Sequence, residues 1–149
     1  MNTFCWNYRG AGKPATVREI REFAMKFTPT VLCIVETKIS GARVEALAST
    51  LGYDQSYAID SQGRSGGMGM FWNNTIKLEI LGDSCYHIDA KVQVEGEEPW
   101  RFTVIYGEAQ TNLRHQTWDR LKGISTLNDL PWLCMGDFNE VLHQTSNRV

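Results

Sequence analysis

One stretch near the end of the chain decides the fold and marks a candidate site: Trp132–Glu140, which reads WLCMGDFNE. Its apolar first half is typical of a buried strand, and Gly136 lets the backbone turn or be approached closely where that strand ends. On continuing strand geometry, Asp137 and Asn139 point to the same side. A carboxylate beside a carboxamide suits binding of a phosphate group or a metal-bound water. The same residue types also form Asx-rich turns, in which side chains bond the local backbone, and this stretch alone leaves both interpretations open.

The bulk composition indicates one globular domain over residues 1–149. The chain is 42% apolar and 21% charged, which is typical of a folded rather than a disordered protein. Its formal net charge is −2, so the molecule as a whole does not attract nucleic acid, which usually shows as a basic excess. A local basic patch stays open.

The four cysteines are Cys5, Cys33, Cys85 and Cys134, and none forms a Cys-x-x-Cys pair. We expect free thiols in a reducing compartment. No signal peptide precedes the first predicted strand, and the longest uninterrupted apolar run, Val31–Val35, is far too short to span a bilayer. The expected location is therefore intracellular, nuclear or cytoplasmic, without secretion or membrane insertion. The sequence points to no obligate protein partner.

The first half of the chain alternates strand and helix patterns. The predicted strands are Thr3–Trp6, Val31–Val35 and Gln55–Ile59, and the predicted helices are Ala15–Phe27 and Ala42–Leu51. The continuous apolar run at Val31–Val35 suits a strand that is buried on both faces, as inside an α/β sheet.

The second half is richer in strand patterns. Strand-like runs separated by turn residues predict antiparallel hairpins; they are Met68–Trp72, Ile76–Leu81, Tyr86–Val94 and Arg101–Tyr106. A helix is predicted at Leu113–Lys122, with Leu113, Trp118 and Leu121 on its inner face. The whole pattern is that of a mixed α/β (α+β) domain.

Four apolar strands end in polar side chains that can do chemistry. These side chains are Asn7, Glu36, Tyr106 and the pair Asp137 and Asn139. In open α/β sheets, ligands bind beyond the carboxyl ends of strands, so we expect the five side chains to form one site.

These residue types fit metal-assisted phosphodiester hydrolysis. Glu36 is a candidate ligand for Mg²⁺, which prefers one or two carboxylates together with phosphate and waters. Asp137 can orient or deprotonate a water, while Asn7 and Asn139 can hydrogen-bond to it and to the phosphate without adding charge. Tyr106 can donate to the phosphate oxygen that gains charge. The competing interpretations are a surface Glu36–Lys38 ion pair, an ordinary strand-end tyrosine and a turn asparagine.

Several motifs resemble the endonuclease/exonuclease/phosphatase superfamily, which has the DNase I-like fold. The matching segments follow the family's order along nearly the whole chain: Trp6–Gly12, Glu36–Lys38, Gly66–Trp72, Tyr106-Gly107 and Pro131–Glu140. The pattern is most similar to the apurinic/apyrimidinic-type endonuclease domain of plant LINE (non-LTR) retrotransposons.

The resemblance implies a role for each matching residue. Glu36 would be the metal ligand, with Asn7 helping to hold the metal and the phosphate. Tyr106 would contact the phosphate or the transition state, and Asp137 and Asn139 would position the attacking water and the phosphate. The implied cofactor is Mg²⁺, with Mn²⁺ as the alternative. The implied fold is a four-layer α/β sandwich, whose second sheet we expect to be incomplete here.

The sequence departs from the family in one respect. The family's later Asp-His pair has no counterpart, because no Asp-His dipeptide is present. We interpret His87, His115 and His143 as structural or surface residues. We therefore expect a domain that lacks its C-terminal portion and has little or no activity, since loss of a general acid–base residue typically costs about 10²–10⁴ in rate.

Three functions compete. The first is a DNA endonuclease of the retrotransposon type, and the second is a phosphatase or phosphodiesterase acting on lipid or small phosphates. The third is a non-catalytic nucleic-acid-binding remnant of a retroelement. Basic residues in loops and helix starts can contact the DNA backbone without reading bases, or they can form an ordinary solvated surface; they are Arg9, Lys13, Lys38, Arg64 and Arg114.

Overall fold

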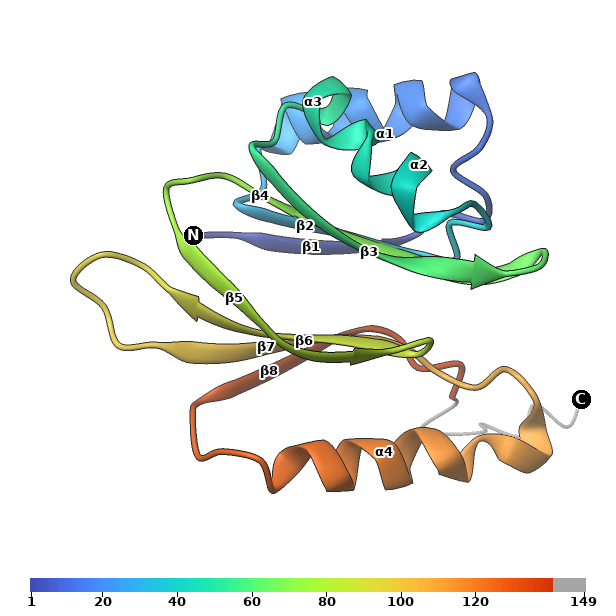
Figure 1. The fold of residues 1–149 in the computed structure, drawn as a ribbon, viewed down its shortest axis with the longest axis vertical. Coiled ribbons are helices and arrows are strands. Elements are labelled where there is room, and N and C mark those ends of the chain that lie inside the picture. The colour runs from blue at the N-terminus through green and yellow to red at the C-terminus, as the bar shows by residue number, and fades with distance from the viewer. Residues whose placement is uncertain (141–149) are drawn as a thin grey trace, which may run out of the picture.

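The computed structural model describes residues 1–140, and in it two four-stranded sheets lie face to face (Figure 1). The first sheet has the order β1-β2-β4-β3 and consists of β1 (Thr3–Asn7), β2 (Val31–Val35), β3 (Gln55–Gln62) and β4 (Ser65–Trp72). The second has the order β5-β6-β7-β8 and consists of β5 (Lys77–Ser84), β6 (His87–Gln93), β7 (Trp100–Tyr106) and β8 (Trp132–Asp137).

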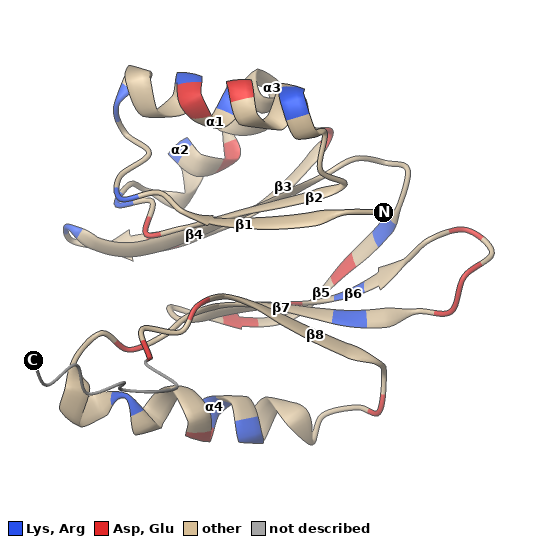
Figure 2. Cartoon of the chain, turned by 180° about the vertical axis from the view of Figure 1, so that it is seen from behind, with Lys and Arg blue, Asp and Glu red and all other residues tan. Residues whose placement is uncertain are grey.

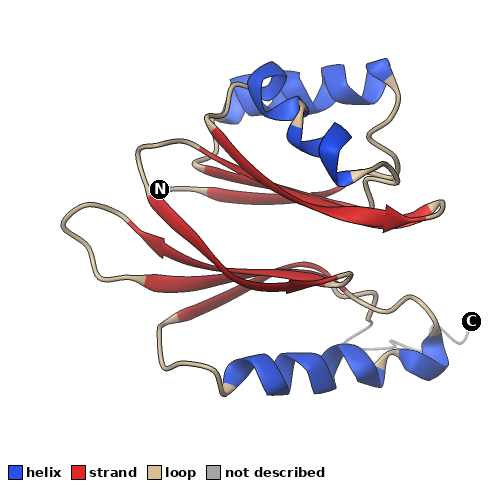
Figure 3. Cartoon of the chain, viewed as in Figure 1, coloured by secondary structure: helices blue, strands red, loops and turns tan. Residues whose placement is uncertain are grey.

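Helices cover the outer face of each sheet, which gives the four layers expected from the sequence (Figure 3). The first sheet is covered by α1 (Pro14–Phe27), α2 (Gly41–Glu45) and α3 (Leu47–Leu51); the second is covered by α4 (His115–Ser125), which follows the short 3₁₀ turn η1 (Thr111–Leu113). None of the described helices is long and apolar enough to cross a membrane.

The main core lies between the two sheets. Alternate residues of β2 and β4 meet alternate residues of β6 and β7, as the two-residue period of a strand requires. The fully buried members include Val35, Met70, Ile88 and Phe102. A second cluster, which includes Ile20 of α1 and Leu32 and Ile34 of β2, joins the helices to the first sheet. β2 is therefore buried on both faces, as its continuous apolar run predicts.

Two parallel strand pairs set the position of the polar strand ends. β1 pairs with β2, and α1 is the connection between them in the sequence. In the same way β7 pairs with β8, and α4 lies in the connection. β1 and β8 are edge strands of different sheets and contact each other. The carboxyl ends of β1, β2, β7 and β8 therefore gather at one end of the sandwich.

Three expectations about the elements are wrong. β4 forms no hairpin with β5, because β4 pairs with β2 and β3 and the chain then crosses to the second sheet. The predicted helix Ala42–Leu51 is two short helices joined at Ala46. Val44 and Leu51 both pack in the cluster between the helices and the first sheet. Trp118 does not face inward: α4 buries Thr117, Leu121 and Ile124 instead.

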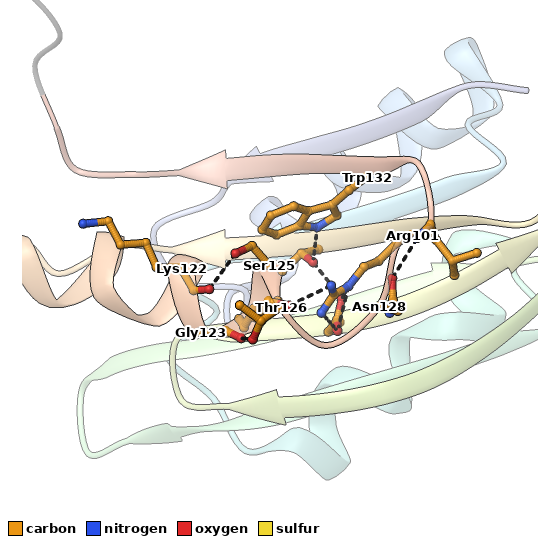
Figure 4. A network of polar contacts seen from close by, with 11 residues as sticks. Arg101, Lys122, Gly123, Ser125, Thr126, Asn128 and Trp132 are labelled. Atoms are coloured by element: carbon orange, nitrogen blue, oxygen red, sulfur yellow. Dashed lines mark hydrogen bonds and ion pairs between the residues drawn. The ribbon is translucent and has the colours of Figure 1, made fainter.

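A buried polar network joins α4 and the start of β8 to β6 and β7 (Figure 4). Arg101 is 1% exposed, and its Nε and Nη2 donate to both oxygens of Asp89 at 2.6–3.1 Å, while Nη1 donates to the Ile124 carbonyl at 2.8 Å. Thr103 donates to Asp89 and accepts from the indole N–H of Trp132 at 2.8 Å. Each buried charge therefore has partners, which is the condition for tolerating a charge in a core.

Candidate active site

The strand register brings the predicted side chains together. Asn7 lies beside Val35, the residue before Glu36, and Tyr106 lies beside Asp137. The two pairs come from different sheets that meet at the β1–β8 contact. The expectation that these strand ends lie at one place is thus met by the geometry.

A direct hydrogen bond joins the two sheets at this place. The side-chain amide Nδ2 of Asn7 donates to Oδ2 of Asp137 at 2.6 Å. The remaining amide oxygen, Asn7 Oδ1, is buried and has no hydrogen-bond partner among the residues that the structure describes. A buried acceptor without a partner is costly, so this atom is available to a ligand that the site holds.

Asp137 and Asn139 are arranged by a turn and not by continuing strand geometry. The strand ends at Asp137, and Asn139 has a φ of +50°. The backbone N–H of Asn139 donates to Asp137 Oδ1 at 2.9 Å, which is an Asx-type turn. The two interpretations of this stretch are compatible: the turn fixes Asp137 Oδ1, while Oδ2 faces Asn7.

Gly107 holds this turn against the end of β7. Its N–H donates to the Asp137 carbonyl at 2.6 Å, and its carbonyl accepts from Asn139 Nδ2 at 2.7 Å. A Cβ atom at position 107 would collide with the Phe138 carbonyl. Sequence reasoning assigned Gly107 no role of its own; its position directly after Tyr106 was the available signal.

Glu36 lies in a tight loop whose backbone is unusual. Glu36 and Lys38 have φ values of +60° and +58°, so three of the four non-glycine residues with positive φ among residues 1–140 are at this site. Such conformations persist where surrounding structure enforces them, and here Thr37 and Lys38 donate backbone bonds to Gly67 and Gly66. The Glu36 carboxylate, 16% exposed, pairs with Lys38 Nζ at 3.4 Å. The Glu36–Lys38 ion pair therefore forms within the site.

The charged and polar side chains of the site act on the pKa of the Tyr106 phenol. Burial raises the pKa of its phenol, and the charges of Glu36 and Asp137 raise it further, while Arg9 and a hydrogen bond from Asn139 oppose them. The phenol therefore keeps its proton at neutral pH and can act as a hydrogen-bond donor.

The donor set fits a hard divalent cation. Among residues 1–140 no group of three or more His, Cys, Asp or Glu side chains could hold a metal. Mg²⁺ needs less, since it binds through one or two carboxylates and keeps several waters. The Glu36 carboxylate and Asn7 Oδ1, which has no hydrogen-bond partner among residues 1–140, are oxygen atoms of this kind.

Figure 2 shows Lys and Arg spread over the helices and sheets of both halves, and the four candidate basic residues differ in their relation to the site. Arg9 and Lys38 belong to the site, through their interactions with Tyr106 and Glu36. Arg64 is exposed at the tip of the β3–β4 turn, and Arg114 pairs with Glu140 at 3.8 Å. Arg114 lines a pocket of about 1000 Å³ that also includes Asn7, Asp137 and Asn139.

The remaining predictions concern the histidines and cysteines. His87 is partly buried beside Ser84 and His115 is exposed at the start of α4, which agrees with structural and surface roles; His143 lies outside the described residues. All four cysteines are free, as expected. Sequence reasoning missed the stacked rings of Trp118 and Phe138, 5.8 Å apart, which border the site.

Several solved structures share this fold at low sequence identity. A functionally unknown conserved protein from Enterococcus faecalis has a TM-score of 0.72 at 14% identity, with 94% of this chain and 67% of that one covered. D. rerio TDP2 complexed with single-strand DNA product has a TM-score of 0.68 at 17% identity, with coverages of 93% and 60%. The endonuclease domain of TRAS1, a telomere-specific non-LTR retrotransposon, has a TM-score of 0.66 at 12% identity, with coverages of 94% and 61%.

The chain thus spans about two thirds of the length of these structures. No curated protein matches the sequence. The sequence matches the Endonuclease/Exonuclease/phosphatase family over residues 2–149, which is nearly the whole chain. This protein therefore belongs to the Endonuclease/Exonuclease/phosphatase family.

Proposed function

We propose that this protein is a divalent-metal-dependent phosphodiesterase that acts on DNA as an endonuclease of the retrotransposon type. The observation that carries the proposal is the 2.6 Å hydrogen bond between Asn7 and Asp137, which joins the two halves of the site across the sheets. The motif resemblance and the TRAS1 endonuclease domain among the similar structures favour the retrotransposon type.

Each residue has a task in this proposal. Glu36 and Asn7 Oδ1 hold the metal ion, Mg²⁺ or Mn²⁺, which neutralises charge on the phosphate when it is bound. Asp137, fixed through both oxygens, orients the attacking water. Asn139 and the protonated Tyr106 donate hydrogen bonds to phosphate oxygens. Arg9 and Lys38 contact the DNA backbone.

Two measurements on the purified protein test the metal and the reaction. Mn²⁺ binding is followed by electron paramagnetic resonance, and nicking is followed as conversion of supercoiled plasmid to open circles. Glu36→Gln should abolish the Mn²⁺ site, and Asp137→Asn should slow nicking by about 10²–10⁴. The matched controls are Glu97→Gln and Asp129→Asn, because both residues are exposed in loops.

The outcomes separate the competing functions. Long incubations allow slow nicking to be detected. Hydrolysis of inositol phosphates in preference to plasmid would favour the phosphatase function. Salt-sensitive DNA binding without any nicking would favour the non-catalytic remnant. Mn²⁺ affinity and nicking that are unchanged in Glu36→Gln would contradict the proposed site.

A further inference from the structure

A second pocket, of about 290 Å³, adjoins the candidate site and shares Tyr106 with it. Its walls come from three segments: the β3–β4 turn with Gly66 and Gly67, the turn at Tyr86 before β6, and the loop Gly107–Gln110 after β7. Figure 1 shows these three segments at the same end of the two sheets. A nucleotide adjoining a phosphate held beside Tyr106 can therefore reach this pocket.

The lining is acidic, and among residues 1–140 it contains no Lys, Arg or His. Its charged members are Asp60 and Glu108. The negative field disfavours a phosphate in this pocket, whereas Arg9 and Lys38 favour one in the site itself. Such a lining suits a neutral group that donates hydrogen bonds to the carboxylates.

Glu108 is held in a fixed position. Its Oε2 accepts from the Tyr86 hydroxyl at 3.2 Å and its Oε1 accepts from the Gln110 N–H at 3.3 Å. Its own N–H donates to the Thr117 hydroxyl at 2.9 Å. The Arg120 guanidinium lies 4.0 Å from the centroid of the Tyr86 ring and fixes that ring as well. Each carboxylate oxygen keeps a further lone pair for a ligand.

Backbone forms part of the wall at Gly66, Gly67 and Gly107. A Cβ atom on Gly67 would collide with the Thr37 hydroxyl, and one on Gly107 would collide with the Phe138 backbone. Protein atoms therefore fill the space beside both glycines, and the wall is closely packed there.

We propose that this pocket binds the nucleobase next to the phosphate held at the candidate site, and that it prefers cytosine and adenine, which carry an amino group at C4 and C6 respectively, over thymine, which carries a carbonyl at C4. The carboxylates of Glu108 and Asp60 accept hydrogen bonds from such an amino group. Thymine presents a carbonyl oxygen at the corresponding edge and meets the carboxylates with repulsion. The inference rests on the proposed function, because it requires a DNA strand at the site.

Short oligonucleotides test the preference directly. The probes are fluorescein-labelled thymidine pentanucleotides in which one cytosine replaces thymine at each position in turn, with Ca²⁺ in place of Mg²⁺ and binding followed by fluorescence anisotropy. We expect about tenfold tighter binding for cytosine at one position and no change at the others. Adenine at that position should bind similarly.

Two variants assign the preference to the pocket. Glu108→Gln can donate to the thymine carbonyl, so the preference should fall to about twofold or reverse. Ala109→Leu adds bulk to an exposed lining residue and should remove the preference. Glu97→Gln should leave it intact, and thermal melts of all variants show whether each is folded.

The outcomes distinguish this inference from the proposed function. Equal affinity for every base at every position, or a preference that survives Glu108→Gln, overturns the base pocket while leaving the metal site and nicking intact. Failure of every oligonucleotide to bind overturns both the pocket and the DNA substrate.

Discussion

Asn7 and Asp137 are 130 positions apart in the sequence, and their side chains meet at 2.6 Å where edge strand β1 of one sheet contacts edge strand β8 of the other. The candidate site is therefore an inter-sheet structure. A change in how the two sheets pack moves its two halves relative to each other, so the stability of the sandwich and the geometry of the site are coupled at this bond.

Asn7→Asp should place two carboxylates against each other at that contact. We expect the free energy of unfolding to fall by about 1–3 kcal/mol at neutral pH, because the new acid repels Asp137 and Asp137 Oδ2 loses the donor that Asn7 supplied. Urea denaturation at neutral pH measures this loss.

Asn112→Asp is the matched control for this change, since Asn112 is exposed on η1. Its stability should stay within about 0.5 kcal/mol of the unmodified protein. Equal stability of Asn7→Asp and Asn112→Asp at neutral pH would show that Asn7 and Asp137 are not in contact in solution.

Gly107→Ala should damage the site through the backbone. The added Cβ collides with the Phe138 carbonyl, so the Asp137–Asn139 turn must move away from β7. We expect destabilisation and, if the chain nicks plasmid, a loss of nicking.

Gly123→Ala provides the contrast, because Gly123 lies in α4 with open space around its Cβ position. That variant should gain about 0.5–1 kcal/mol, as expected for replacing a helical glycine. Unchanged melting of Gly107→Ala would contradict the described packing.

The sequence predicted the strand ends well because apolar runs stop abruptly at Asn7, Glu36 and Tyr106. It did not predict how Asp137 relates to Asn139, since residue spacing cannot tell a continuing strand from a turn whose N–H bonds the side chain. It also misplaced Trp118, because on α4 the stacking partner Phe138 comes from a distant turn. The periodicity of apolar residues along the sequence predicts where helices and strands lie. It does not predict which strand or ring packs against another, because tertiary packing decides that.

His87 should give the protein a pH-dependent component of stability. Burial lowers the pKa of its imidazole, and its Nδ1 lies 2.6 Å from the Ser84 hydroxyl. A lowered pKa in the folded state means that the unfolded chain binds the proton more readily. Stability is therefore present above the unfolded pKa of about 6.5 and is lost as the pH falls through the folded pKa. Unfolding free energies between about pH 5 and pH 7.5 should show this slope.

The variant His87→Gln removes the titrating group and keeps a polar side chain beside Ser84. Its unfolding free energy should fall less steeply toward acid pH than that of the unmodified protein. Parallel curves for the two proteins over this range would mean that His87 is equally easy to protonate in the folded and unfolded states.

Arg101 and Asp89 should be strongly coupled, because both are buried and share bonds with Thr103 and the end of α4 (Figure 4). Arg101→Met leaves the Asp89 charge without its cation, and Asp89→Leu leaves Arg101 without its anion. Each single change should cost about 3–5 kcal/mol. The double variant should recover much of that loss, since an apolar pair of similar volume needs no compensation for charge.

Denaturant unfolding of the four proteins measures the coupling. As a control, Arg21→Met on the exposed face of α1 should change stability by less than about 0.5 kcal/mol. Additive losses in the double variant would mean that the two charges do not compensate each other in the core.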